Sequence, residues 1–154
     1  MRSQKDTYFD ELYICNRGKR KAVFTRKKIP AGNTILRMQG EIMSRPDVYS
    51  IQIDTSKHLG PGGLIDDEMN HSCDANARIN FDNLTIESKK DIEIGEEVCI
   101  NYCATEEELA SPFTCDCGNP RCYGIIKGFK HLNEMQRKSI KNDLSPYLQK
   151  KYFG

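Results

Sequence analysis

The chain has 154 residues, of which 38% are hydrophobic and 29% charged, and its formal net charge is only +1. This size suits one domain, and the near-neutral charge excludes a global positive field of the kind that binds nucleic acid. No apolar run approaches the roughly 20 residues that span a bilayer. We therefore expect no membrane association and no direct binding to nucleic acid.

Seven cysteines occur in a chain whose first residues, Met1 to Asp6, lack the apolar stretch of a secretory signal. Thiols in such a chain are typically reduced or bound to metal rather than paired in disulfides. We therefore expect an intracellular protein of the cytoplasm or nucleus.

Charge is unevenly distributed along the chain. Residues 1–28 hold nine Lys or Arg against three acids, whereas residues 82–108 hold nine acids against two bases. Two readings stay open, namely two ordinary solvated faces or an acidic rim that attracts a basic peptide.

Short runs rich in β-branched and aromatic residues predict strands between residues 12 and 102. These runs are 22–25, 34–38, 51–54, 77–81, 84–87 and 98–102. Asp82 and Asn83 predict a hairpin between two of them, and the glycines and proline of residues 59–63 predict a loop. Because no long helical period interrupts this region, we expect a mostly β fold of the α+β class, built from small antiparallel sheets.

The last segment has helical signals. Asn133 followed by Gln136 resembles a capping box and predicts a helix that runs to about Asp143. Pro146 is expected to end or break that helix. Whether this tail packs on its own chain or joins two chains stays open, so the expected state is a monomer or a homodimer.

Three cysteines within eight residues predict a metal site. Cys115, Cys117 and Cys122 enclose Gly118 and Pro120, which favour a sharp turn. A structural zinc site takes four such ligands in a tetrahedron, so a fourth must come from elsewhere. The best candidate is Cys73, in the polar segment Asn70-His71-Ser72-Cys73, and Cys15, Cys99 and Cys103 are alternatives. A zinc ion bound this way would fasten the C-terminal tail onto the Asn70–Cys73 segment.

Three motifs together resemble the SET-domain methyltransferases. Residues 70–77, Asn-His-Ser-Cys-Asp-Ala-Asn-Ala, are similar to that family's NHSCxPN signature. Residues 95–102 are similar to its GEE–strand–Tyr motif, and residues 113–122 to its post-SET zinc loop. Order and spacing agree across all three, and the resemblance covers roughly residues 12–130.

The resemblance implies an organisation and an activity. It divides the chain into an N-terminal segment (1–11), a SET domain (12–104), a post-SET zinc segment (105–130) and a helical tail (131–154). The SET fold threads through itself in a pseudoknot that brings the Asn70 loop beside the Tyr102 strand. The expected activity is methyl transfer from S-adenosyl-L-methionine (AdoMet) to a lysine ε-amine of a protein or peptide, with a histone tail as one candidate.

The resemblance also assigns site residues. Tyr102 would be the catalytic tyrosine, and Tyr49 and Ile100 would line the substrate channel. The zinc ligands would be Cys73, Cys115, Cys117 and Cys122. The residues that would contact AdoMet are Ala22, Phe24, Asn70, His71 and Phe113.

The sequence departs from the family pattern in three places. Arg20-Lys21-Ala22 stands where the family has Gly-x-Gly, Met38 replaces an aromatic residue, and Asp67-Glu68-Met69 replaces a basic residue before Asn-His. Lys19, Arg20 or Lys21 is then expected to meet the cofactor carboxylate. Ile100 offers no hydroxyl to hold a water, so we predict a pocket that admits lysine already carrying methyl groups.

Three other functions are compatible with parts of the sequence. A non-catalytic SET-like module would bind a partner through the zinc-held surface, and it should not bind AdoMet. A cysteine hydrolase would pair Cys73 with His71, but residues two apart rarely have nucleophile–base geometry, and a zinc-bound thiolate cannot also attack. A zinc protein that binds nucleic acid through residues 17–28 lacks interleaved aromatic residues and a large net charge.

Overall fold

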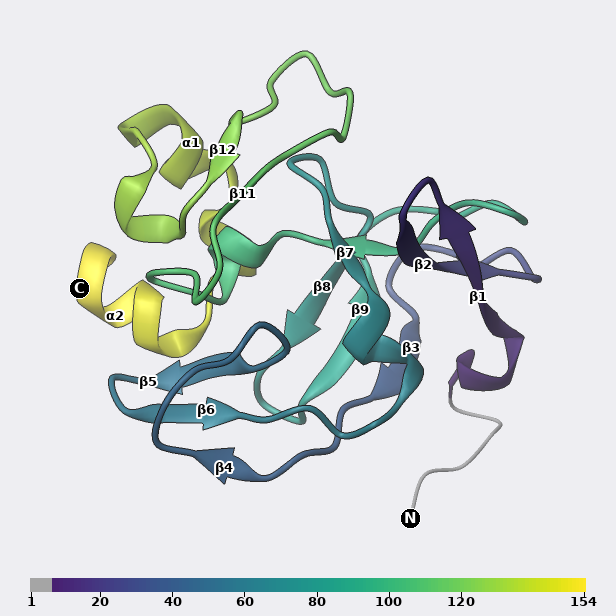
Figure 1. The fold of residues 1–154 in the computed structure, drawn as a ribbon, viewed down its shortest axis with the longest axis horizontal. Coiled ribbons are helices and arrows are strands. Elements are labelled where there is room, and N and C mark those ends of the chain that lie inside the picture. Colours follow the sequence, from purple (N-terminus) through teal and green to yellow (C-terminus); the bar gives the residue numbers. More distant parts are fainter. Residues whose placement is uncertain (1–6) are drawn as a thin grey trace.

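The computed structural model describes residues 7–154, and Figure 1 shows small sheets surrounded by loops with short helices. The strands are β1 Leu12–Arg17, β2 Arg20–Thr25, β3 Thr34–Arg37, β4 Ile42–Met43, β5 Ile51–Asp54, β6 Lys57–Leu59, β7 Asn70–His71, β8 Ala77–Asn80, β9 Thr85–Ser88, β10 Cys99–Ile100, β11 Phe113–Thr114 and β12 Ile125–Ile126. The 3-10 turns are η2 Phe9–Glu11, η3 Ile65–Glu68, η4 Tyr102–Ala104, η5 Phe129–His131 and η6 Lys141–Asp143. The α-helices are α1 Glu134–Ser139 and α2 Pro146–Phe153.

The sheets have two or three strands each, with the orders β1-β2, β3-β9-β8, β4-β6-β5, β11-β12 and β10-β7. All of these pairs are antiparallel except β10 with β7, which run parallel. Figure 1 places the β1–β2 hairpin on the opposite side of β7 from β5 and the C-terminal helices. The mostly β, α+β class expected from the sequence is therefore confirmed.

Two hydrophobic clusters support this architecture. The larger one gathers buried residues of the sheets, among them Val23, Leu36 and Ile86, and Tyr102 packs against its edge. The second lies under the tail and includes Ile126, Phe129 and Leu148. Apolar burial stabilises each cluster, and the second one attaches the tail to its own chain.

Most strand predictions were confirmed, but β1, β4 and β6 were missed. The runs 22–25, 34–38, 51–54, 77–81 and 84–87 match β2, β3, β5, β8 and β9, and Asp82 and Asn83 lie in the turn between β8 and β9. The missed strands have no clear alternation of apolar and polar side chains, and β4 has only two residues. The run 98–102 was predicted too long, because η4 begins at Tyr102.

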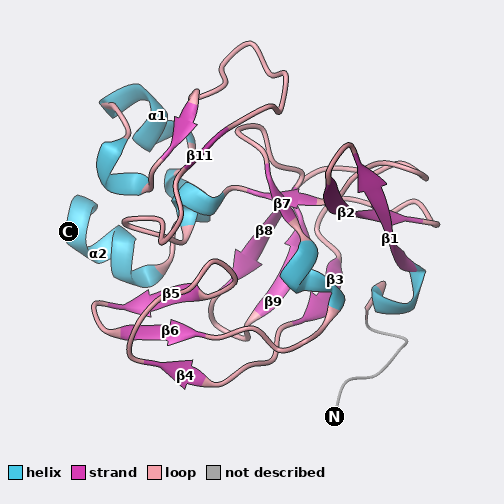
Figure 2. Cartoon of the chain, in the orientation of Figure 1, coloured by secondary structure: helices cyan, strands magenta, loops and turns pink. Residues whose placement is uncertain are grey.

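The C-terminal prediction was partly wrong. Asn133 and Gln136 do form a capping box, but α1 ends at Ser139 rather than near Asp143. Pro146 does not end a helix; it begins α2, with Ser145 as the N-cap. Proline suits the first helical position because its missing N–H has no intrahelical partner there. Figure 2 shows the two α-helices side by side at the C-terminal end of the chain.

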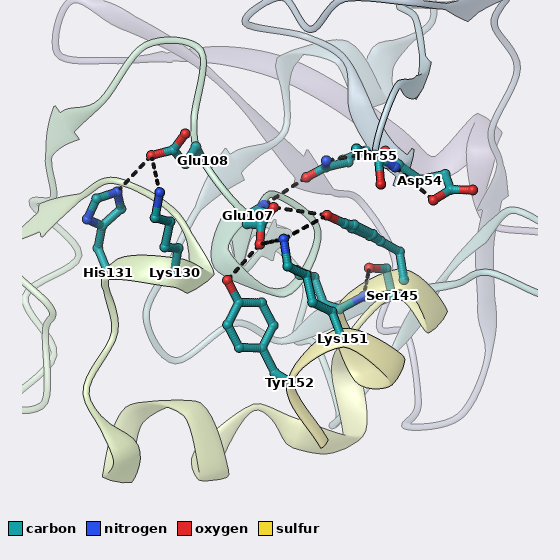
Figure 3. A network of polar contacts seen from close by, with 12 residues as sticks. Asp54, Thr55, Glu107, Glu108, Lys130, His131, Ser145, Lys151 and Tyr152 are labelled. Carbon is teal, nitrogen blue, oxygen red and sulfur yellow. Dashed lines mark hydrogen bonds and ion pairs between the residues drawn. The ribbon is translucent and has the colours of Figure 1, made fainter. Parts of the chain in front are cut away.

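Polar contacts also hold the tail in place (Figure 3). The Glu107 carboxylate accepts hydrogen bonds from the hydroxyls of Tyr147 and Tyr152 and pairs with Lys151 of α2 at 2.7 Å. Asp143, which is buried, contacts both Arg78 and Lys89 of the central sheet region. Within residues 7–154, no helix is long and apolar enough to cross a membrane.

Candidate active site and cysteine cluster

Segments 70–76 and 97–101 are joined by backbone and side-chain hydrogen bonds. β7 pairs with β10 so that Asn70 lies opposite Cys99 and His71 opposite Ile100. The Asn76 side chain accepts from the Cys99 N–H at 3.0 Å and donates to the Glu97 carbonyl at 2.8 Å. The segment that carries Asn70 and His71 is thereby fixed beside the strand that leads to Tyr102.

His71 connects this junction to Tyr102 and to Cys73. Its Nδ1 accepts a hydrogen bond from the Tyr102 backbone N–H at 3.0 Å, and its Nε2 lies 3.3 Å from the Cys73 sulfur. Burial lowers the pKa of His71 to about 4, so the ring is neutral near pH 7. Because Nδ1 is the acceptor, Nε2 carries the proton and points it at Cys73.

The Tyr102 side chain is held by a short hydrogen bond. Its hydroxyl donates to the Met69 carbonyl at 2.6 Å. Burial raises the pKa of Tyr102, so the hydroxyl stays protonated near neutral pH. With the proton directed to Met69, the oxygen lone pairs remain available to another group.

Tyr102 lines a cavity of about 630 Å³. The aromatic rings of His71, Tyr102 and Phe113 meet edge-on in its wall, with centroids 5.4 to 6.0 Å apart. Many of its other lining residues come from the β1–β2 turn, the segment before β5, η3 and the segment before β11. The lining includes Arg17, Gly18, Lys19, Arg20, Asp47, Val48, Tyr49, Ser50, Ile51, Asp66, Asp67, Met69, Asn70, Ile100, Thr105, Glu106, Leu109, Thr114 and Asp116. A cavity of this size accommodates a cofactor together with part of a substrate.

The β1–β2 turn contributes the positive charges of the cavity. Arg20 pairs with Asp116 at 2.7 Å and lowers the pKa of that carboxyl, and Arg17 contacts Asp116 and Glu97. Lys19 also lines the cavity, and within residues 7–154 no carboxylate forms an ion pair with it. Its charge is therefore the one in this turn not neutralised by an ion pair.

Glu106 is a lining residue that the sequence did not single out. It belongs to the acidic run 82–108, yet its side chain is only 8% exposed. Burial raises the pKa of Glu106 to about 7, although it accepts a hydrogen bond from the Gln52 N–H at 2.9 Å. Nothing in the sequence distinguishes it from its neighbours Glu107 and Glu108; only the fold places it inside.

Four cysteines converge beside this cavity. The sulfur atoms of Cys73, Cys115, Cys117 and Cys122 all lie within 4.8 Å of one another. Cys73 lies 3.8 Å from Cys115 and 4.0 Å from Cys122. Tetrahedral ligands at a Zn–S distance of about 2.3 Å would be roughly 3.8 Å apart, so the spacing fits zinc. Of the four candidates for the fourth position, Cys73 is the one in the cluster.

Hydrogen bonds reach the sulfur atoms of the cluster. The Tyr123 N–H donates to Cys73, and the Cys117 N–H donates to Cys115. Burial nevertheless raises the pKa of Cys73, and raises that of Cys115 to about 11. These thiols would not ionise unaided near pH 7, whereas a bound cation would stabilise their thiolates.

The structure brings most of the expected site residues together. Asn70, His71, Ile100, Tyr102 and Phe113 all line the cavity. Tyr49 lines it too and is 51% exposed, which suits a position at its mouth.

Two expected cofactor contacts are not among the residues that line the cavity. Ala22 is fully buried in β2, and Phe24 stacks on Tyr13. Lys21 approaches the site instead, because its carbonyl accepts a hydrogen bond from the Asn70 side chain at 2.9 Å.

His71 and Cys73 lie in direct contact, with 3.3 Å between Nε2 and Sγ. This contact corrects the expectation that residues two apart in the sequence would not approach each other as a hydrolase pair does. The tautomer makes His71 a donor toward the sulfur rather than a base, and Cys73 belongs to the four-cysteine cluster. A nucleophile needs a partner that accepts its proton, so this contact does not have hydrolase geometry.

Comparison with known proteins decides the family. The family model described as the SET domain matches residues 20–103, more than half of the chain. The chain belongs to the SET domain family. The chain is 29% identical over 111 residues to Methyltransferase flvH from Aspergillus flavus, a match that covers 68% of this chain and 60% of that protein.

Solved structures show the same fold. Two crystal structures of KRYPTONITE with SAH, one with mCHG DNA and one with mCHH DNA and an H3(1-15) peptide, match with a TM-score of 0.61 and 20% identity. These matches cover 74% of this chain and 28% to 29% of those chains. The methyltransferase domain of human Histone-lysine N-methyltransferase SETMAR matches with a TM-score of 0.61 and 17% identity, over 76% of this chain and 58% of that one.

Proposed function

We propose that this SET domain is an AdoMet-dependent protein-lysine N-methyltransferase that holds one structural zinc ion. The observation that carries the proposal is the wall of a single cavity. Tyr102, the Asn70-His71 segment and Phe113 meet there, and Phe113 stands two residues before the first tail cysteine of the cluster.

Zinc has a structural role in this proposal. Four sulfur ligands leave no open position for a reacting group, as in structural zinc sites elsewhere. Cys73 comes from the central segment and the other three ligands from the segment after Phe113. The ion would therefore hold the Phe113 wall of the cavity against the Asn70 segment.

AdoMet, when bound, supplies an electrophilic methyl group. The family relative is named a methyltransferase, and the KRYPTONITE structures contain SAH, the product that AdoMet leaves after methyl transfer. In this chain Asn70 and His71 would contact the cofactor through backbone and amide groups, and Phe113 would pack on its adenine. Lys19 would meet its carboxylate, because Arg20 already pairs with Asp116. The roles of Ala22 and Phe24 stay predictions.

Tyr102 and Ile100 shape the substrate end of the site. The Tyr102 oxygen, whose proton is directed to Met69, can accept from the amine or from the polarised methyl group and so align the two. Ile100 is buried and lines the cavity, and it has no hydroxyl to hold a water there. We therefore predict that the substrate pocket also admits lysines that already carry methyl groups.

The substrate class follows from charge. Asp47, Asp66, Asp67 and Glu106 line the cavity, and Tyr49, which is 51% exposed, lines it too. A basic lysine-containing peptide, with a histone tail as one candidate, suits this arrangement. The cell compartment, the oligomeric state and the absence of nucleic-acid binding stay predictions.

The test is incubation of zinc-loaded protein with labelled AdoMet and a panel of histones and cell lysates. Tyr102→Phe should lower labelling by about 10² or more, because a single positioned polar group at a transition state is typically worth this much. Unchanged AdoMet binding by the variant would show that the site is intact. Equal labelling by both proteins would remove the proposed role of Tyr102.

A non-catalytic interaction module is the second candidate, favoured by the replacements at Ala22 and Met38. Met38 is buried in the larger hydrophobic cluster and is not among the residues that line the cavity. Failure of the zinc-loaded protein to bind AdoMet would favour this alternative.

A further inference from the structure

Glu106 is a buried carboxylate in the wall of a cavity that is expected to receive an amine. Its side chain is 8% exposed, and it lines the same cavity as Tyr102, Tyr49 and Ile100. A carboxylate in such a place loses hydration, and this cost is normally offset by a cation or by several hydrogen bonds. The Gln52 N–H and the Thr105 side chain form hydrogen bonds with Glu106, but neither group carries a positive charge.

The backbone around Glu106 holds the side chain in a fixed position. Its N–H donates to the Tyr102 carbonyl at 2.9 Å, and its carbonyl accepts from the Phe129 N–H at 2.9 Å. The Oε2 atom accepts from the Gln52 N–H of β5 at 2.9 Å. Glu106 is thus one turn beyond Tyr102, with its backbone held by η4 and η5 and its carboxylate held by β5.

Among residues 7–154, no cation neutralises Glu106. Within residues 7–154, none of the lysine, arginine or histidine side chains forms an ion pair with it. The titratable groups that share its cavity or belong to the elements packed around it are Arg17, Lys19, Arg20, Asp47, Tyr49, Asp54, Asp66, Asp67, His71, Tyr102, Cys103, Asp116, Lys130, His131, Tyr147, Lys150, Lys151 and Tyr152.

Most cations among these groups pair with other carboxylates, and Lys19 and Lys150 form no ion pair within the described residues. Arg17 and Arg20 contact Asp116 in the basic turn, and Lys130 and His131 contact Glu108. Lys151 pairs with Glu107, the next residue along the chain (Figure 3). Two adjacent glutamates therefore have different roles, since Glu107 anchors α2 and Glu106 faces the cavity without a cation.

We propose that Glu106 binds the ammonium group of the substrate amine and then takes one of its protons. The inference rests on the proposed methyltransferase function and names a residue for its substrate. The ammonium gives one proton to a Glu106 oxygen, which leaves a neutral amine and a neutral carboxyl group. The amine lone pair then forms the N–CH₃ bond as the S–CH₃ bond breaks, and Glu106 later returns its proton to water.

The protonation behaviour of Glu106 is consistent with this role. Burial raises its pKa to about 7, so near neutral pH it both ionises and accepts a proton readily. Free lysine has a pKa near 10.4 and is mostly cationic at neutral pH. A base inside the cavity can remove the proton that prevents the amine from acting as a nucleophile.

The competing explanation is structural. β5 is at the edge of its sheet, and the Glu106 carboxylate could serve only to satisfy the Gln52 N–H. Glu106→Gln separates the two roles, because a glutamine side-chain oxygen accepts the same hydrogen bond without charge. Glu134→Gln is the matched control, since it removes one carboxylate from the exposed face of α1.

The experiment measures binding of n-butylamine, a mimic of the lysine side chain, to zinc-loaded protein saturated with SAH. NMR titration at pH 8 should give a dissociation constant about 10-fold higher for Glu106→Gln than for the wild type and for Glu134→Gln. Equal constants in all three proteins would overturn the proposal. Failure of the wild type to bind SAH would instead refute the methyltransferase function, so the two failures are distinguishable.

If Glu106→Gln does not fold, the pH dependence of n-butylamine binding to the wild type still tests the proposal. n-Butylamine stays cationic between pH 5.5 and 8, so its affinity for the wild type should rise over this range as Glu106 ionises. Affinity that is constant over this range would overturn the proposal. In a transfer assay, kcat/KM of the wild type should show a limb near pH 7 that Glu106→Gln lacks and Glu134→Gln keeps.

Discussion

At the residue scale, the site depends on which polar groups already have partners. Asn70 donates to the Lys21 carbonyl and to Glu97, Tyr102 donates to Met69, and Arg20 pairs with Asp116. These contacts fix the walls of the cavity before any ligand arrives. Other groups, such as Lys19 and the Tyr102 oxygen, can still form hydrogen bonds or ion pairs. These are the groups that would contact ligand atoms.

Lys19→Ala should weaken AdoMet binding by about 5- to 10-fold, because a charge-assisted hydrogen bond from this exposed lysine to the cofactor carboxylate would be lost. Calorimetry with AdoMet checks this. Lys27→Ala is the matched control, since it removes the same charge from an exposed position that does not line the cavity. A larger loss for Lys27→Ala than for Lys19→Ala would refute the assignment.

Glu106 should also influence stability as a function of pH. Its folded-state pKa is raised from 4.5 to about 7 by burial, so between these values the folded protein keeps a proton that the unfolded chain releases. Stability therefore falls as pH rises through this window, by about 3 kcal/mol for a shift of this size. Glu106→Gln, which is always neutral, should remove this contribution.

Urea unfolding at pH 5 and pH 8 measures the effect. The free energy of unfolding of Glu106→Gln, relative to the wild type, should increase from pH 5 to pH 8, whereas that of Glu134→Gln should not. If the stability of Glu106→Gln relative to the wild type does not change with pH, the pKa of Glu106 is not raised in the folded state.

At the element scale, the tail has its own hydrophobic cluster. Leu148 of α2 is fully buried beside Phe129 and Ile126, whereas Met135 of α1 is 80% exposed. Leu148→Ala should lower the free energy of unfolding by about 2–4 kcal/mol through lost burial and a cavity. Met135→Ala should change it by less than about 0.5 kcal/mol. Similar values in a denaturant titration would show that α2 does not pack as described.

The elements that the sequence predicted share a strong local signal. β2, β3, β8 and β9 contain β-branched runs bounded by turn residues, and the capping box of α1 is a pattern of two side chains. The parallel pair of β7 with β10 has no such signal, because each strand has two residues and the pairing links positions about thirty residues apart. Pro146 was misread because the same residue is typical both after a helix and at the first position of one.

The cysteine cluster could be predicted because thiol spacing is a chemical constraint that does not depend on the fold. The cavity could be predicted only where the family resemblance reaches, at Tyr49, Asn70, His71, Ile100, Tyr102 and Phe113. Glu106 was out of reach, since three consecutive glutamates look equivalent until η4 and β5 bury one of them.

At the scale of the whole molecule, the chain closes on itself at the cysteine cluster. Residues of the SET segment supply the Asn70 wall and the basic turn, and the following segment supplies Phe113 and three cysteines. Asp116, between two of these cysteines, pairs with Arg20 and adds a second connection. Cofactor binding is therefore expected to depend on the metal, although the metal does not contact the cofactor in this account.

The dependence of cofactor binding on zinc is the central claim. Calorimetry tests it by measuring the affinity of the protein for AdoMet before and after a chelator removes the zinc. We predict one AdoMet site per chain in the zinc-loaded protein and at least a 10-fold loss of affinity after removal, because the Phe113 wall would no longer be held. Circular dichroism would show whether the β core survives. Folded, zinc-loaded protein that does not bind AdoMet, or whose affinity does not depend on zinc, would contradict the account.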